Sequence, residues 1–336
     1  MQKNKGLLNF SEEMRWIFDR EPIVLFDVGA SGAPPRLWRE LAPISYYVGF
    51  DPDLRELRED NSYGFNRFII FNKAVVDTDC EKHLFHLTVY PGCSSLLKPN
   101  IENLRHYSYT ELFEVQEIIN VPAMKIGSAL SRIEGDRIDW LKLDSQGKDM
   151  DLFCSLDETV QNRLLVIDIE PGVTNFYEGE NTFSQTHDAL LKKGFWLSKI
   201  NLQYNPRISK KTRERLASQA IDFKGLPGNP TAVEAQYFRT LEHLEYIHAS
   251  QRDYLCHWLL AMLNSNYGFA LDIAVLISAQ DRKLGDSLVQ RTREQIIKYY
   301  RTRKKPLADR LRALVPAKFK TPTRRLVNAV QRRASL

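Results

Sequence analysis

The strongest constraint on the fold is an alternation of short apolar runs with amphipathic stretches in the first half of the chain. Each run is long enough for a buried strand but too short for a buried helix. Five core strands are predicted, at Ile23–Val28, Tyr46–Phe50, Phe68–Phe71 together with Ala74–Val76, Ile138–Leu143 and Leu164–Ile169. Strands that alternate with helical patterns are typical of βαβ units. The sequence therefore predicts an α/β fold with a doubly wound, mostly parallel sheet.

Further elements are predicted around this sheet. The alternating segment Lys82–Tyr90 is predicted as a strand outside the parallel set. Helices are predicted at Lys148–Leu156 and at Thr182–Lys193, the second of which ends before Gly194. Phe195–Leu202 and Ala235–Phe238 are predicted to complete the sheet, with Pro206–Pro230 as a variable excursion between them.

The last hundred residues have a helical pattern. Apolar residues recur at helical spacing from about Thr240 onward. The apolar stretch Tyr254–Ser278 contains His257, Asn264 and Asp272, which would be costly in lipid. We therefore expect two buried helices there and no membrane span.

Charge is unevenly distributed along the chain. Residues 291–336 carry 15 Lys/Arg against 2 Asp/Glu, so the total of +5 leaves −8 for the other 290 residues. A nucleic-acid groove across the core would need positive charge there, so no specific nucleic-acid partner is expected. The four cysteines form no Cys-x-x-Cys pair, and no disulfide framework or metal site is predicted. Without a continuous apolar run at the start of the chain, we expect a cytoplasmic protein.

A glycine-containing loop, Asp27-Val28-Gly29-Ala30-Ser31-Gly32, follows the first predicted strand. Glycine lets the backbone turn sharply and approach a ligand closely. Ligands of doubly wound sheets bind at the carboxyl ends of the strands, so this loop is placed to hold an adenosine-containing cofactor. Ser31 and Pro34 interrupt the Gly-x-Gly-x-x-Gly fingerprint of dinucleotide-binding proteins. The alternative is a purely structural strand-to-helix turn.

Two acidic residues follow the second predicted strand. Asp51 is placed to accept hydrogen bonds from both ribose hydroxyls of a cofactor. Its alternative role is an Asx turn or a helix cap. Asp53 is better suited to cap a helix predicted at Leu54–Arg58.

A third motif, Leu141 to Gly147, places Asp144 at a strand end before a glycine-containing turn. Taken in order, the motifs resemble those of the FkbM-type S-adenosylmethionine-dependent methyltransferases, over roughly residues 20–240. The matching positions are Asp27 to Gly32, Asp51, Asn72 with Ala74 and Asp77, Ser94 to Leu96, Leu141 to Gly147, Asp168, Glu170, Tyr177 and Gly194-Phe195. Two positions depart from the family pattern: Asp149 stands where a Glu is usual, and Ala33-Pro34-Pro35 is an unusual entry to the first helix.

The resemblance implies a Rossmann-like methyltransferase fold that uses S-adenosylmethionine. The implied cofactor-binding residues are Asp27, Gly29, Ala30, Ser31, Gly32, Asp51 and Asn72. The donor is an activated sulfonium, so catalysis needs positioning and removal of a proton from the acceptor, and no metal. The candidate bases are Asp144, Glu170 and His187, and the resemblance favours Asp144, close to the transferred methyl group.

We expect three parts: a methyltransferase domain over residues 1–240, a helical extension over 241–290 and a basic amphipathic tail over 291–336. In the tail, Leu307, Leu311 and Leu314 share one helical face among lysines and arginines. Such a segment can lie on an anionic membrane surface, which would make the protein peripheral to the inner face of a membrane. A solvated tail, and an arm that binds a protein or nucleic acid, are the alternatives.

The expected function is O-methylation of a hydroxyl group on a sugar, a glycan or another natural product. An NAD(P)-dependent oxidoreductase is one alternative, and the missing glycines of its fingerprint weigh against it. The other alternative is an inactive methyltransferase fold that serves as a binding module, and intact Gly29, Asp51 and Asp144 weigh against that. The acceptor itself stays open, because a fold does not determine its substrate.

Overall fold

The computed structural model describes residues 15–53, 60–133, 136–223 and 225–303. The chain divides into two compact units, the first ending at Asn264 and the second beginning at Ser265. The helix predicted at Leu54–Arg58 and the tail beyond Arg303 lie outside the described residues. The domain boundaries at residues 240 and 290 stay predictions.

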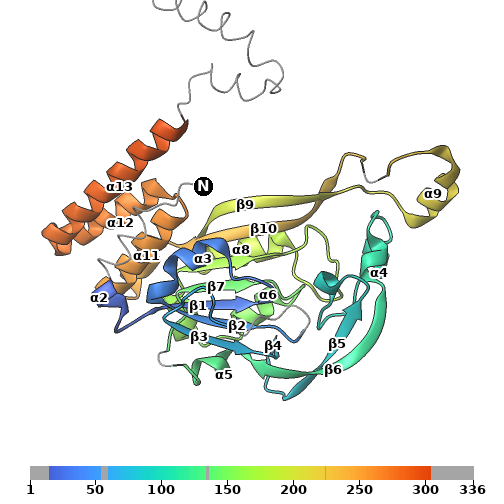
Figure 1. The fold of residues 1–336 in the computed structure, drawn as a ribbon, viewed down its shortest axis with the longest axis horizontal. Helices are drawn as coiled ribbons and strands as arrows, with labels where there is room; N and C mark the ends of the chain where they lie inside the picture. The colour runs from blue at the N-terminus through green and yellow to red at the C-terminus, as the bar shows by residue number, and fades with distance from the viewer. Residues whose placement is uncertain (1–14, 54–59, 134–135, 224, 304–336) are drawn as a thin grey trace, which may run out of the picture. The chain divides into compact units, whose positions relative to one another are not determined.

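A seven-stranded central sheet confirms the predicted doubly wound α/β fold, with the strand order β3-β2-β1-β7-β8-β10-β9 (Figure 1). Its strands are β1 (Ile23–Val28), β2 (Ser45–Phe50), β3 (Arg67–Phe71), β7 (Trp140–Leu143), β8 (Val166–Ile169), β9 (Phe195–Asn205) and β10 (Asn229–Arg239). The first five strands in the spatial order run parallel, and β10 is antiparallel to both of its neighbours. The strands β1 and β2 are buried along their whole length, as expected for a sheet covered on both faces.

A second sheet of three strands has the order β4-β6-β5 and comprises β4 (Ala74–Val76), β5 (Lys82–Thr88) and β6 (Val115–Lys125). The strand predicted at Lys82–Tyr90 is confirmed outside the parallel set, paired antiparallel with β6. Two corrections concern this sheet. Ala74–Val76 does not extend the third core strand, because the chain leaves the central sheet after Phe71. We also missed β6, whose outer half is exposed and therefore lacks an apolar run.

Helices cover the central sheet unequally. The helices of the first unit are α2 (Arg15–Phe18), α3 (Arg36–Leu41), α4 (Ile101–Leu104), α5 (Ile126–Leu130), α6 (Asp149–Cys154), α7 (Glu158–Arg163), α8 (Phe183–Lys192), α9 (Lys210–Arg215), α10 (Leu241–Tyr246) and α11 (Gln251–Leu263). On one face of the sheet, Ile126 of α5, Phe153 of α6, Val160 of α7 and Leu190 of α8 pack into the main apolar core. On the other face, Trp38 of α3 meets Trp140 with ring centroids 5.5 Å apart.

The predicted helices Lys148–Leu156 and Thr182–Lys193 are confirmed as α6 and α8. A capping box starts α8, in which Thr182 and Gln185 satisfy each other's backbone N–H groups. The last two strands also complete the sheet as predicted, and both are longer than expected: β9 continues to Asn205, and β10 begins at Asn229, inside the segment expected as a variable excursion. Figure 1 shows β9 and β10 continuing past the sheet as a long hairpin toward α9.

The strand order reverses between β1 and β7. From β1 the chain moves outward to β2 and β3, and it later returns to the other side of β1 to build β7 and β8. Such a switch point opens a crevice at the carboxyl ends of the strands. Gly29, Asp51, Asp144 and Glu170 each follow one of these strands, so the topology brings them to one edge of the sheet.

The helical pattern after Thr240 is also confirmed. The apolar stretch Tyr254–Ser278 forms parts of two helices, α11 and α12 (Tyr267–Gln280), and α11 is buried from Arg252 to Leu263. The second unit pairs α12 with α13 (Arg282–Arg303), where Tyr267 meets Tyr299 at a centroid distance of 5.8 Å. Among the described residues, no helix combines the length and apolar character of a membrane span.

We propose that residues 304–336 direct the protein to anionic membrane surfaces. This segment carries ten Lys/Arg against one Asp and begins after α13, so its removal leaves the described helices whole. Full-length protein should bind anionic vesicles and lose that binding as salt is raised, because exposed charges are screened over about 8 Å at physiological ionic strength. A 1–303 protein should bind weakly at every salt concentration. Equal binding by both proteins in vesicle sedimentation would support the solvated tail instead.

Candidate active site

The glycine loop packs directly against the end of β7. Gly29 has a φ of +80°, and its N–H group and that of Ala30 donate to the carbonyl of Phe50, each at 3.0 Å. A Cβ atom at position 29 would lie 2.4 Å from the carbonyl oxygen of Asp144. Only glycine fits there, since both the backbone angle and the close approach exclude a side chain. The loop and Asp144 are therefore held together.

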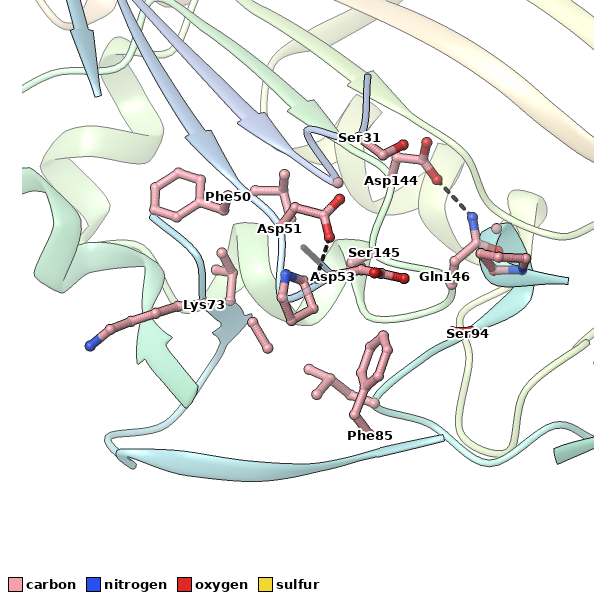
Figure 2. A pocket seen from close by; sticks show the side chains of 18 of the residues that line it. Ser31, Phe50, Asp51, Asp53, Lys73, Phe85, Ser94, Asp144, Ser145 and Gln146 are labelled. Carbon is pink, nitrogen blue, oxygen red and sulfur yellow. Dashed lines mark hydrogen bonds between the residues drawn. The ribbon is translucent and has the colours of Figure 1, made fainter. Parts of the chain in front are cut away.

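A cavity of about 250 Å³ opens beside this loop. Its apolar wall is formed by Val28, Phe50, Ala74, Val75, Phe85 and Leu96. Its polar residues are Ser31, Asp51, Asp53, Lys73, Ser94, Asp144, Ser145 and Gln146. Figure 2 shows Phe85 facing the cavity from the second sheet, opposite Asp51 and Asp144 at the strand ends of the central sheet. The cavity thus combines an apolar slot with a row of acids.

Asp51 lies at the carboxyl end of β2 and is only 7% exposed. One carboxylate oxygen, Oδ1, accepts a hydrogen bond of 2.7 Å from the backbone N–H of Asp53. This is the Asx turn considered as the alternative role, and it coexists with a place on the cavity wall. Burial, followed by the nearby charges of Asp53 and Asp27, raises the pKa of Asp51 to about 6 despite that hydrogen bond. Asn72 donates from Nδ2 to the backbone carbonyl of Asp51 at 3.0 Å, so it positions this loop from outside the cavity lining.

Asp27 does not line the cavity. It is 3% exposed and accepts hydrogen bonds from the Tyr47 hydroxyl at 2.8 Å and from Lys142 Nζ at 2.9 Å. Ala30 and Gly32 are also absent from the lining, whereas Gly29 and Ser31 are part of it. The role of each predicted cofactor ligand stays a prediction, and for Asp27 the contacts indicate an indirect role through Lys142.

Lys142 connects the glycine loop to Asp144, and the sequence did not single it out as a site residue. Its ammonium group donates to Asp27 and, at 3.2 Å, to the carbonyl of Gly29, and it lies 3.7 Å from Asp144 Oδ2. The charges of Asp27 and Asp144 raise its pKa against the opposing effect of burial. The sequence did contain a signal for this residue, since Lys142 lies inside an otherwise apolar predicted strand. A buried charge needs partners, so such a lysine indicates nearby acids.

Asp144 is oriented by a short chain of hydrogen bonds. Its Oδ1 accepts a 2.7 Å bond from Gln146 Nε2, and the oxygen of that amide lies 3.1 Å from the Tyr177 hydroxyl. Gln146 has a φ of +55°, in the left-handed region that costs free energy for a residue with a side chain. Figure 2 shows the carboxylate of Asp144, which lines the cavity, bonded to the amide of Gln146 in this turn.

A second cavity, of about 410 Å³, shares Tyr90, Gly92, Asp144 and Gln146 with the first. Its other lining residues include the aromatic Tyr109, Phe113, Phe176 and Tyr177 and the polar Glu170, Gln203 and Asn205. The two cavities therefore meet at Asp144.

Glu170 follows β8 and faces the second cavity. Burial, reinforced by the charges of Asp144 and Asp149, raises the pKa of Glu170 to about 8. Gln203 donates a hydrogen bond to its carboxylate. Asp149, where the family usually has Glu, is fully buried and accepts hydrogen bonds from the backbone N–H groups of Ser145 and Glu170. It thereby fixes the spacing of the loops after β7 and β8.

His187 lies apart from these acids. Its Nδ1 is 3.0 Å from the Tyr237 hydroxyl, and its ring stacks on Phe183 with centroids 5.5 Å apart. Among the described residues it lines neither of the two cavities. Its contacts account for a packing role, so its candidacy as a base has less support than that of Asp144 or Glu170.

The raised pKa of Glu170 predicts how stability depends on pH. The folded state holds this proton up to about pH 8, whereas a free glutamate loses it near pH 4.5. Stability should therefore fall as pH rises between these values, because the folded state binds the additional proton. Urea unfolding between pH 6 and 8 should show this fall in the wild type and a weaker fall in Glu170→Gln. Asp168→Asn is the control, since the pKa of Asp168 is raised only to about 6. An unchanged slope in Glu170→Gln would contradict the prediction.

Residues 38–197 match the family model of the methyltransferase FkbM domain. No curated protein matches the chain. A crystal structure of magnesium protoporphyrin IX methyltransferase from Synechocystis with bound SAM is similar at 8% identity, covering 71% of this chain and 86% of that chain. Its TM-score of 0.27 is too low to support an argument. The family match confirms the resemblance found in the sequence, and with it the enzyme class and the cofactor.

Proposed function

We propose that this S-adenosylmethionine-dependent methyltransferase, which carries an FkbM domain at residues 38–197, transfers the methyl group to a hydroxyl oxygen of a sugar or another natural product. The observation that carries the proposal is the position of Asp144 between two cavities. One cavity has the features that a nucleoside needs. The other brings a second carboxyl group, Glu170, to the same junction.

The cofactor would bind in the cavity of about 250 Å³ beside the glycine loop. The apolar side chains of Val75, Phe85 and Leu96 would contact the adenine ring, and Asp51 would accept hydrogen bonds from the ribose. Gly29 leaves room for close approach of the backbone. The carboxylate of Asp144 complements the positive charge of the sulfonium, which supplies an activated methyl group when S-adenosylmethionine is bound.

The cavity of about 410 Å³ would hold the acceptor. Its aromatic residues offer an apolar wall, while Gln203 and Asn205 offer amide groups that bond hydroxyls in either direction. An acceptor there would present its hydroxyl to Asp144 and Glu170. Direct displacement requires the oxygen to lie in line with the methyl group, so positioning by these walls is a main contribution to the rate.

Asp144 and Glu170 would share the task of taking the hydroxyl proton. A base works best with a pKa near the working pH, and Glu170 has a pKa of about 8. Asp144 lies at the junction itself, where it would contact the reacting hydroxyl, as the family resemblance favours. Because the two carboxyl groups influence each other's ionisation, they release their protons as a coupled pair.

The first test of this proposal concerns Asp51. Asp51→Ala should weaken binding of S-adenosylmethionine and of S-adenosylhomocysteine by about tenfold to hundredfold, since a hydrogen bond to a charged group contributes about 1.5–3 kcal/mol. Asp51→Asn retains an acceptor for the Asp53 N–H group and should lose less affinity. Asp53→Ala is the matched control, because Asp53 lies two residues after Asp51 and lines the same cavity. It should keep its affinity for S-adenosylmethionine. Titration calorimetry with thermal melts decides, and unchanged affinity in folded Asp51→Ala would remove this acid from the site.

The second test separates the candidate bases. Asp144→Asn should lower turnover by about 10²–10⁴-fold with little change in cofactor affinity, because a general base contributes that much to a rate. Glu170→Gln should flatten the rise of kcat with pH around pH 8. His187→Gln should leave kcat within a few-fold of wild type. Loss of turnover in His187→Gln alongside normal turnover in Asp144→Asn would reverse the assignment.

A further inference from the structure

A third cavity lies on the face of the central sheet that α3 covers only in part. It measures about 390 Å³, within the range of small-molecule sites, and Asp144 and Glu170 stand at its edge. One wall is formed by Pro35 and the first turn of α3, from Arg36 to Trp38, and the floor is built from four neighbouring strands, β7, β8, β10 and β9. We name it the sheet-face groove.

The floor of the sheet-face groove is polar where a doubly wound sheet is usually apolar. Lys142, Asp168, Gln236 and Lys199 are direct cross-strand partners and form one row across the four strands. Asn201 and Glu234, which pair with each other, line the groove beside this row. Buried sheet faces are normally near-continuous apolar surfaces. Here Gln236 is buried, Lys142 and Asp168 are half-buried and Lys199 is exposed, so the polar row is open to a ligand.

A β-bulge in β9 creates half of this floor. Tyr237 pairs with Leu197 and Gln236 with Lys199, so one residue of β9 is inserted between these two pairs. Leu197 packs on the apolar core, whereas Lys199 and Asn201 line the groove. Without the inserted residue, the alternation of strand side chains would point Lys199 and Asn201 to the opposite face. Bulges that redirect side chains in this way are frequent next to active sites.

Two buried polar atoms at the groove have no hydrogen-bond partner among the described residues. One is the donor Nε1 of Trp38, which is fully buried, and the other is the acceptor Oε1 of Gln236, whose side chain is 8% exposed. The amide nitrogen of Gln236 is used, since it donates to Asp168 Oδ1 at 2.8 Å. Buried polar atoms are nearly always bonded, so the unpaired acceptor of Gln236 in the floor of the groove points to a ligand group that donates to it.

The charges of the groove favour a neutral ligand. Its lining contains the four acids Asp144, Asp168, Glu170 and Glu234 and the three bases Arg36, Lys142 and Lys199. Lys142 is already paired with Asp27. No excess of positive charge remains to attract a phosphate or carboxylate. Hydroxyl groups both donate and accept, which matches the mixture of carboxylates, amides and ammonium groups.

We propose that the sheet-face groove binds a neutral polyhydroxylated ring, a sugar unit, beside the reaction centre. The ring lies across the row from Asp168 to Lys199 and is held by Gln236 and Asn201. Since Asp144 and Glu170 reach both this groove and the acceptor cavity, the sugar unit and the reacting hydroxyl belong to one acceptor. That last step rests on the proposed function, whereas sugar binding itself does not.

The test measures sugar binding directly by saturation-transfer NMR on the full-length protein with S-adenosylhomocysteine present. The probes are the methyl glycosides of glucose, galactose, mannose and rhamnose, with the methyl glycoside of glucuronic acid as the charged comparison. At least one neutral glycoside should give a signal and the glucuronide a weaker one. No signal from any neutral glycoside, or binding of the glucuronide alone, would overturn the proposal.

Variants locate the binding. Gln236→Leu and the exposed Asn201→Leu should each weaken the neutral glycoside by about threefold to tenfold, the effect of losing one hydrogen bond. Tyr237→Phe is the matched control, because it removes a hydroxyl from the same strand on the opposite sheet face. Unchanged binding in folded Asn201→Leu and Gln236→Leu would place the sugar elsewhere and refute the groove.

The outcome for the groove can be separated from that for O-methylation. A glycoside that binds in the groove while no hydroxyl compound is methylated supports the groove and counts against the proposed function. If a hydroxyl acceptor is methylated but its binding is unchanged by Gln236→Leu and Asn201→Leu, the proposed function is supported and the sugar site in the groove is contradicted.

Discussion

The site depends on the contacts of the Lys142 ammonium group. This group lies between Asp27 of β1 and Asp144 after β7, and it also bonds the carbonyl of Gly29. These groups come from the two strands between which the sheet order reverses. Removing the lysine would leave Asp27 buried without its cation, at the cost that unpaired buried charges carry. Lys142 thus fixes the glycine loop and Asp144 relative to each other.

Around this lysine the carboxyl edge of the sheet gathers more acids than it has cations to neutralise. Asp51, Asp168 and Glu170 are buried enough that each has a raised pKa. Grouped acids of this kind are unfavourable for folding, and proteins retain them mainly at functional sites. A cationic donor lowers that cost when it binds. The neutral acceptor that we propose would add no further charge.

Asp144 lines all three cavities, and each cavity has a different structural origin. The switch point provides the first cavity, the aromatic cluster around Phe176 encloses the second, and the bulge in β9 opens the third. Two of the predicted cofactor residues also stabilise the site: Asp51 forms an Asx turn, and Asp27 forms an ion pair with Lys142. Both carboxylates were visible in the sequence, whereas the partners of Asp27, Tyr47 and Lys142, come from the neighbouring strands β2 and β7.

The sequence by itself determined the sheet, the order of its motifs, the family and the cofactor, because strand periodicity and strand-end glycines and acids are local features. It located Asp51, Asp144 and Glu170, which the fold brings to one edge. It did not predict β6, whose exposed half carries no apolar pattern, nor the separation of β4 from β3. Only the tertiary structure separated His187 from the acids and aligned Lys142, Asp168, Gln236 and Lys199 across four strands. Register between strands distant in sequence and a one-residue bulge set that row, and neither leaves a periodic signal in the chain.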